Sequence, residues 1–179
     1  MHCKQRGFSL IELLIAVAII LIIAAIAVPN LLRSRMAANE ASAVSAMRTI
    51  NTAASSYNSM YSNGFPPSLT ALGTGGTTVT NCTSAQLIDE TLSSGTKGGY
   101  LFQFQPGLAA NQLNSTSSTC AGAYGYTDGY MVTAVPIMVG NTGQRSFCTD
   151  SSGVIRFNMS GTANPGPSPT CSFVDGPIQ

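Results

Sequence analysis

The chain begins with a long apolar segment that contains one carboxylate. No polar side chain occurs from residue 13 to residue 28, and Glu12 stands four residues after Phe8, where the segment starts. As a helix, residues 8–28 would extend about 31 Å, which is close to the hydrocarbon thickness of a bilayer. An ionisable group within such a span is costly and marks a functional site by default. The pattern therefore predicts a membrane-spanning helix in which Glu12 has a specific partner.

The pattern changes after Pro29. Apolar residues then recur at steps of four and three, which is the spacing of one helical face, at Ala43, Met47, Ile50, Ala54, Tyr57 and Tyr61. We expect one long helix over residues 9–61, bent or loosened near Pro29 because an interior proline removes a backbone hydrogen bond. Its second half should bury the apolar face under a globular domain. Asn63-Gly64 and Pro66-Pro67 should end it.

Two short helices are expected after the long one. Ser68 can cap a turn of helix that ends at Gly73, because its hydroxyl can accept a hydrogen bond from a free backbone N–H. Ser84 can cap a second short helix over residues 85–92 in the same way. Its two acids, Asp89 and Glu90, would lie in the early turns, which the helix dipole favours.

The rest of the chain predicts strands. Strand-like segments occur at residues 100–105, 130–135, 145–149 and 154–157. Residues 111–120 are expected to form a polar loop, whereas Asp150-Ser151-Ser152-Gly153 is typical of the turn of a hairpin. A long helix followed by such a meander predicts an α+β fold, with an antiparallel sheet of about four strands packed on the amphipathic helical face.

These elements predict the domain organisation. The expected parts are residues 1–7 ahead of the apolar segment, the membrane helix 8–28, its amphipathic continuation 29–62 and a globular head 63–179. Within the head we expect a connecting region 63–98, a sheet region 99–158 and a tail 159–179.

Four of the five cysteines lie after the apolar segment, at Cys82, Cys120, Cys148 and Cys171. An even set in an exported domain predicts two disulfides, for which three connectivities are possible. We favour Cys82–Cys120 and Cys148–Cys171 because each closes a local, loop-rich stretch, and each would stabilise the fold by roughly 3 to 4 kcal/mol. Four buried free thiols are the alternative. No Cys-x-x-Cys pair occurs, so we expect no zinc site.

Composition argues against several functions. Only 8% of the residues are charged, compared with about 25% in typical soluble domains, and the net charge is +1. Such a surface suits contact with copies of the same chain, and it favours no nucleic-acid partner. The one histidine is His2, so the serines lack a general base, and the acids are scattered. We expect no enzymatic activity, no metal site and no cofactor.

The first residues resemble a known signal. Lys4-Gln5-Arg6-Gly7, followed by Phe8-Ser9-Leu10-Ile11-Glu12-Leu13-Leu14, is similar to the class III signal of type IV prepilins and pseudopilins. The resemblance implies the pilin fold and a leader of residues 1–7, which a membrane peptidase removes by cutting between Gly7 and Phe8. It also implies N-methylation of Phe8. An ordinary secretory signal fits less well, because the apolar segment is long and no small-x-small cleavage site closes it.

The same resemblance implies roles for three further features. Cleavage creates an amine on Phe8, and we favour its pairing with Glu12 of a neighbouring chain, so that Glu12 recruits a new subunit. A pair within one chain and a protonated Glu12 are the alternatives. Pro29 would let the helix loosen during extraction from the membrane. The Cys148–Cys171 stretch resembles the C-terminal region that pilins often staple by a disulfide.

The implied function is that of a structural subunit of a type IV pilus-like filament, which is a helical homo-oligomer. Before assembly the chain would cross the bacterial cytoplasmic membrane once, and afterwards it would lie in an extracellular or periplasmic filament. Its expected partners are the prepilin peptidase and methyltransferase and the assembly platform of a pilus or secretion machine. A pseudopilin of a type II secretion system is one alternative, although the chain lacks tryptophan and the Pro-x-Asp-Pro-Trp-Gly-like stretch of major pseudopilins. A minor subunit that acts as a binding module is another.

Overall fold

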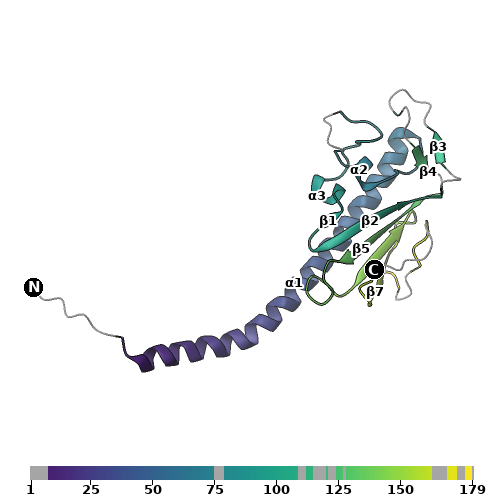
Figure 1. Ribbon diagram of the computed structural model, residues 1–179. Coiled ribbons are helices and arrows are strands. Elements are labelled where there is room, and N and C mark those ends of the chain that lie inside the picture. The colour runs from purple at the N-terminus through teal and green to yellow at the C-terminus, as the bar shows by residue number, and fades with distance from the viewer. Residues whose placement is uncertain are drawn as a thin grey trace, which may run out of the picture. The chain divides into compact units, whose positions relative to one another are not determined.

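The computed structural model describes residues 8–74, 79–108, 112–114, 120, 124–126, 128–162, 169–172 and 176–178. The chain divides into two compact units, Met1–Arg35 and Met36–Gln179. We call the second unit the head. One helix, α1, belongs to both units and covers Leu10–Tyr61 (Figure 1). The predicted helix over residues 9–61 is confirmed, and the helix continues through Pro29.

The head contains the remaining elements. Two short helices, α2 and α3, cover Leu69–Leu72 and Glu90–Ser93. The strands are β1 Thr96–Lys97, β2 Tyr100–Pro106, β3 Gln112–Asn114, β4 Tyr124–Tyr126, β5 Tyr130–Pro136, β6 Ser146–Asp150 and β7 Ile155–Asn158. Five of them form an antiparallel sheet in the order β1-β2-β5-β6-β7, which lies along the second half of α1 (Figure 1).

The second half of α1 buries the face that its periodicity predicts. Ala43, Met47, Ile50, Ala54 and Tyr57 are buried, and they pack in one core with Tyr100, Phe102, Val132, Ala134 and Phe147 of the sheet. Tyr61 is half-buried at the edge of this core. Burial of this stripe is the main source of stability for the head, because apolar area removed from water contributes about 25 cal/mol per Å².

The sheet is covered on part of both faces, which explains why β5 does not alternate. Val132 and Ala134 face the helix, whereas Met131 packs on the other face with Cys148 and Cys171. Tyr130–Pro136 is consequently buried at nearly every position, although antiparallel strands with one wet face alternate. β2 keeps the alternation, since Tyr100 and Phe102 are buried while Leu101 and Gln103 are exposed.

The prediction for the second short helix, α3, is wrong in its length and in its capping residue. The expected helix over 85–92 with Ser84 as its cap is only Glu90–Ser93, and its cap is Asp89, whose carboxylate accepts from Leu92 N. Residues 85–87 instead donate their backbone N–H groups to α2 and its end: Ala85 to Ala71 O at 2.8 Å, Gln86 to Gly73 O at 3.0 Å and Leu87 to Leu72 O at 2.8 Å. These tertiary hydrogen bonds replace the local helical ones. The first short helix, capped by Ser68 and ended by Gly73, is confirmed.

The sheet region also differs from the expectation. β1 adds a fifth strand, because Gly98 and Gly99 both adopt positive φ and turn Thr96–Lys97 back onto β2. The loop expected over residues 111–120 is wrong at 112–114, where β3 pairs with β4 in a second, two-stranded sheet. Residues 111 and 115–119 lie outside the described residues. The hairpin at residues 150–153 is confirmed, with Gly153 N donating to Asp150 O at 2.9 Å.

A hydrogen bond from Tyr57 connects α1 to the region between the helix and the sheet, and its contribution to stability can be measured. The side chain is fully buried, and its hydroxyl donates to Cys82 O at 2.8 Å. Burial, with a smaller contribution from Tyr61, raises the pKa of Tyr57 to about 12. We expect Tyr57→Phe to lower the free energy of unfolding by about 1 to 2 kcal/mol, because a buried carbonyl loses its donor. Tyr61→Phe is the matched control; equal losses in urea titrations of both variants would contradict a role for this hydrogen bond.

Candidate functional site

The start of α1 is closed by a local contact of Glu12. Ser9 N donates to Glu12 Oε2 at 3.2 Å, while Glu12 N donates back to Ser9 O at 3.1 Å. This is the glutamate half of a capping box, the Ser-x-x-Glu arrangement that satisfies a free N–H at a helix start. The sequence analysis missed this role, although the spacing of Ser9 and Glu12 carries the signal. Glu12 therefore has an intrachain hydrogen-bond partner, and its pairing with Phe8 of a neighbouring chain stays a prediction.

The apolar first half of α1 is not covered by other parts of the described chain. Its large apolar side chains are all exposed, from 46% at Val17 to 79% at Leu10. By length and composition, α1 can cross a membrane, although a signal sequence or a buried core helix can pass the same test. About 25 cal/mol for each exposed apolar Å² favours covering this surface with lipid or with other chains. Phe8 is also exposed, and Gly7 lies outside the described residues.

Pro29 is placed inside the helix, as predicted. Having no N–H, it leaves the carbonyl of Ala25 without its intrahelical donor. The next residue, Asn30, donates through its side-chain Nδ2 to Ile26 O at 3.3 Å. The loosening of the helix during extraction remains a proposal.

A buried carboxylate connects the helix to the loop between β5 and β6. Glu40 is 8% exposed and accepts from the backbone amides of Gln144 and Arg145 at 2.9 and 3.2 Å. Arg145 adds a hydrogen bond from Nε at 2.8 Å and an ion pair from Nη2 at 2.7 Å. Burial raises the pKa of Glu40, but these hydrogen bonds and the charge of Arg145 outweigh it, so that the pKa is lowered.

Other polar contacts extend this connection. Asn39 Nδ2 donates to Thr142 O at 2.8 Å, and the Arg145 guanidinium lies 5.7 and 5.6 Å from the ring centres of Phe147 and Phe157. About three turns further along α1, Asn51 donates to Thr149 Oγ1 at 2.9 Å and accepts from Tyr130 OH at 3.0 Å. The sequence analysis did not identify the hydrogen bonds that α1 makes with the sheet and this loop, because each joins residues about 80 to 105 positions apart.

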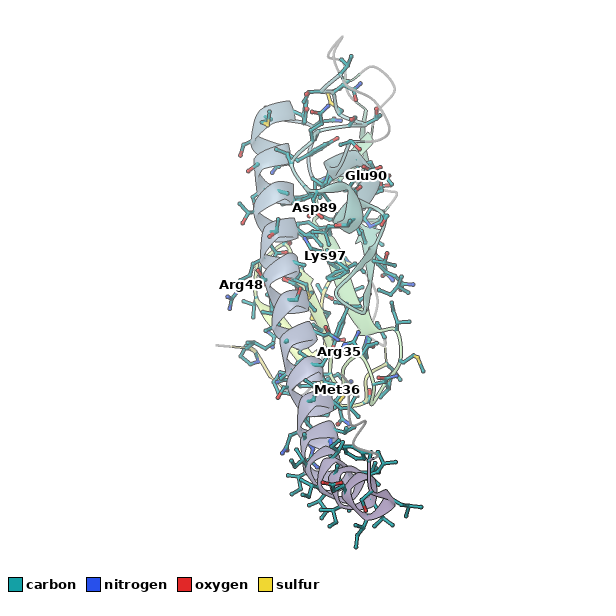
Figure 2. The ribbon with its side chains drawn as sticks, turned by 90° about the vertical axis from the view of Figure 1, so that its left-hand side faces the viewer. Arg35, Met36, Arg48, Asp89, Glu90 and Lys97 are labelled. Atoms are coloured by element: carbon teal, nitrogen blue, oxygen red, sulfur yellow. A yellow bond between two sulfur atoms is a disulfide. The ribbon has the colours of Figure 1, made fainter. Side chains whose placement is uncertain are left out.

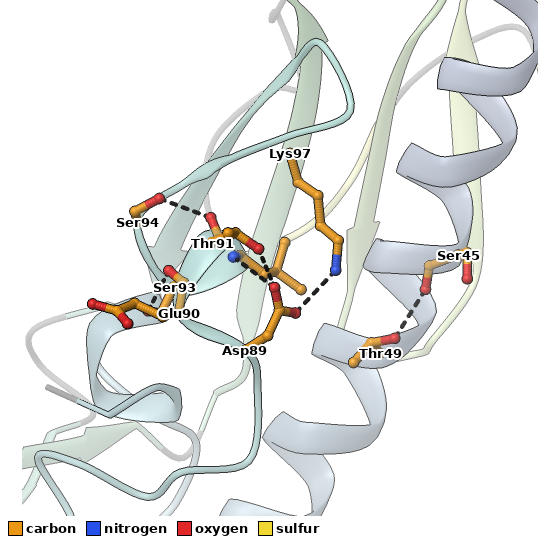
Figure 3. A network of polar contacts seen from close by, with 9 residues as sticks. Ser45, Thr49, Asp89, Glu90, Thr91, Ser93, Ser94 and Lys97 are labelled. Atoms are coloured by element: carbon orange, nitrogen blue, oxygen red, sulfur yellow. Dashed lines mark hydrogen bonds and ion pairs between the residues drawn. The ribbon is translucent and has the colours of Figure 1, made fainter.

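A second polar network surrounds Asp89. Its carboxylate accepts from Lys97 Nζ at 3.0 Å, from the hydroxyl of Thr91 and from Leu92 N (Figure 3). Figure 2 shows Asp89, Glu90 and Lys97 on one side of α1, with Arg48 on the other. The hydrogen bonds from Thr91 and Lys97 lower the pKa of Asp89. The network joins α3 to β1. Both carboxylate oxygens of Asp89 already accept hydrogen bonds from nearby residues, so we interpret the network as stabilising the fold and not as a binding site.

Both favoured disulfide pairs occur in the structure. Cys82 and Cys120 have a Cα–Cα distance of 5.2 Å, and Cys148 and Cys171 one of 5.9 Å, both within the range that a disulfide requires. The second pair holds the tail on the face of the sheet away from α1, where Cys171 N also donates to Asp150 Oδ2 at 3.0 Å. Asp150 further accepts from Ser152 N at 2.9 Å. No group of three metal-binding side chains occurs among the described residues.

Two comparisons with known proteins each match part of the chain. The prokaryotic N-terminal methylation motif matches residues 2–28. The type IV wide pilus major component PilA4 of Thermus thermophilus is 57% identical over 37 residues, which cover 21% of this chain and 28% of that protein. The match thus spans less than a third of that protein's length. No solved structure matches the chain.

A methylation motif and an apolar helical segment, followed by a helix packed on an antiparallel sheet, define a pilin-like α+β protein. The N-terminal segment of the chain carries the methylation motif, and the matched stretch is similar to a type IV pilin, so the comparisons support the type IV pilin and prepilin family. Type IV pilins are structural proteins and not enzymes. The apolar N-terminal helix is typical of a pilin that lies first in a membrane and then in a pilus.

Proposed function

We propose that this chain is a structural subunit of a type IV pilus-like filament and polymerises through the apolar half of α1. The observation that carries the proposal is the combination of the methylation motif with a helix whose large apolar side chains are all exposed. In the cytoplasmic membrane, lipid covers these side chains. In a filament, equivalent helices of other copies cover them, and the interior backbone groups remain satisfied within their own helix, apart from the carbonyl of Ala25 that Pro29 leaves without a donor.

Processing precedes assembly in this proposal. A prepilin peptidase cuts between Gly7 and Phe8, removes residues 1–7 and methylates the amine of Phe8. The cut leaves the whole apolar segment in the mature chain and creates a positive group at its start. An assembly platform then takes the mature chain from the membrane into the growing filament. Loosening of the helix at Pro29 allows this transfer, because the proline leaves one carbonyl without its donor.

Glu12 has two separable roles in the proposal. Its carboxylate closes the helix start through Ser9 N within one chain. Its charge attracts the amine of Phe8 on a neighbouring copy, which aligns the two helices. A neutral side chain of the same shape can perform the first role but not the second, because an amide oxygen accepts a hydrogen bond without carrying charge.

The filament role of Glu12 is tested with two variants. We expect Glu12→Ala and Glu12→Gln to insert into the membrane at the normal level and to lower filament yield at least tenfold. Sheared surface filaments are imaged by electron microscopy, and their subunits are identified by peptide mass spectrometry. Normal filaments from Glu12→Gln would show that Glu12 only caps the helix. Unaltered chain that is processed but never found in surface filaments would refute the proposed function.

A further inference from the structure

The loop between β5 and β6 exposes three consecutive large apolar side chains. Ile137, Met138 and Val139, which we call the apolar tip, are 58%, 57% and 57% exposed. Runs of exposed apolar residues on a soluble surface mark interaction sites more often than isolated ones do. The apolar tip therefore requires an explanation beyond packing within the head.

The apolar tip is held rigidly. Ile137 N donates to Gly99 O at 3.0 Å, and the Thr142 hydroxyl accepts from Met138 N at 3.0 Å. Thr142 N donates back to Met138 O at 2.9 Å. A loop fixed by its own hydrogen bonds loses little conformational entropy on binding, so its exposed side chains are prepared for a partner.

The same loop is attached to α1. Asn39 binds Thr142 O, and Glu40 binds the amides of Gln144 and Arg145 and the Arg145 guanidinium. The loop that carries the apolar tip is thus anchored to the helix through a buried carboxylate.

The chemistry of the apolar tip favours a protein partner over a lipid surface. Segments that bind at the membrane interface carry Trp, Tyr, Lys or Arg beside the apolar residues. Residues 137–144 contain none of these, and the charge of Arg145, the next residue, is paired with Glu40. The uncharged apolar tip is suited to bind an uncharged apolar protein surface. The exposed apolar half of α1 in another copy of this chain is such a surface.

We infer that the apolar tip of one copy docks on the apolar half of α1 of a second copy. The inference rests on the proposed function and adds the head surface that covers part of the exposed helix in the filament. Substituting a charge at Met138 places an ion in an apolar contact without disturbing the core, since Met138 is exposed in the single chain.

Photo-crosslinking tests this contact in the full-length chain. A benzophenone amino acid replaces Met138, cells that form filaments are irradiated, and crosslinked peptides are identified by mass spectrometry. We expect covalent dimers in which position 138 is joined to a peptide within residues 8–35 of the other copy. The matched control is position 60, because Met60 is 59% exposed at the other end of the head's part of α1. It should give at least fivefold less of this product.

The other outcomes overturn the inference. Lipid adducts alone, a crosslink within one chain, or a dimer joined through another head surface would each replace the proposed contact. Met138→Lys should also lower filament yield at least fivefold, whereas Met60→Lys should leave it unchanged. Filaments that contain Met138→Lys at the normal level would contradict the docking contact and leave the proposed function intact. Absence of the unaltered chain from filaments would refute both.

Discussion

A chain in which Gly7 is replaced by isoleucine is expected to keep residues 1–7 and to be absent from filaments. Glycine suits a position where a second protein must approach the backbone closely, because it has no Cβ. A branched side chain there should block the peptidase. Without the cut, Phe8 has no free amine and the basic residues Lys4 and Arg6 stay next to the apolar segment. The expected effect is complete loss of filaments.

The measurement is the N-terminal peptide of the membrane-bound chain, determined by mass spectrometry. The unaltered chain should begin at a methylated Phe8, and the Gly7→Ile variant at Met1. Gln5→Ile is the control, because it introduces the same side chain into the leader away from the cut and should be processed normally. A Phe8 terminus in the Gly7→Ile variant would show that the cut lies elsewhere.

Replacing the buried Glu40 by alanine should destabilise the head more than single polar substitutions at its surface. The change removes the partner of Arg145 and leaves two loop amides without their acceptor. Breaking a buried ion pair on one side costs about 3 to 5 kcal/mol. Because the Arg145 side chain is 39% exposed and can regain water, we expect about 3 kcal/mol, near the lower limit.

Urea unfolding of the full-length chain in detergent measures this effect, with the near-ultraviolet circular dichroism of tyrosine as the signal, since tryptophan is absent. Glu40→Gln is the matched variant. It keeps an oxygen that can accept from the Gln144 and Arg145 amides but loses the charge, so its loss in the free energy of unfolding should be about half of that in Glu40→Ala. A loss below about 1 kcal/mol in Glu40→Ala would show that the loop is held by other contacts, since most surface changes are that small.

The stability contributed by Glu40 should also depend on pH. The pKa of Glu40 is lowered from its ordinary value of 4.5 in the folded chain. A lowered carboxyl pKa stabilises the fold above the unfolded value, and this stabilisation is lost as pH falls through the folded value. The difference between the unaltered chain and Glu40→Gln should therefore be constant from pH 7 to about pH 5 and should shrink below pH 4.5.

Local sequence patterns determined much of this protein. The extent of α1 and its buried stripe follow from a helical spacing that the chain keeps after Pro29. The cap at Ser68 and the hairpin at residues 150–153 follow from side chains and glycines that act on their own backbone. The methylation motif is a contiguous pattern and needs no fold to be identified. All of these depend on residues within a few positions of one another.

Tertiary structure alone decided the rest. Residues 85–87 pair with α2 because its end offers backbone acceptors, which no local pattern shows. Glu40 reaches a loop more than 100 residues away, and β5 is buried on both faces because Cys148–Cys171 holds the tail over one of them. The apolar tip is apparent only once Ile137–Val139 are seen to remain exposed. These features depend on which distant segments meet, because burial and hydrogen bonding across the chain are set by the packed structure and not by neighbouring residues.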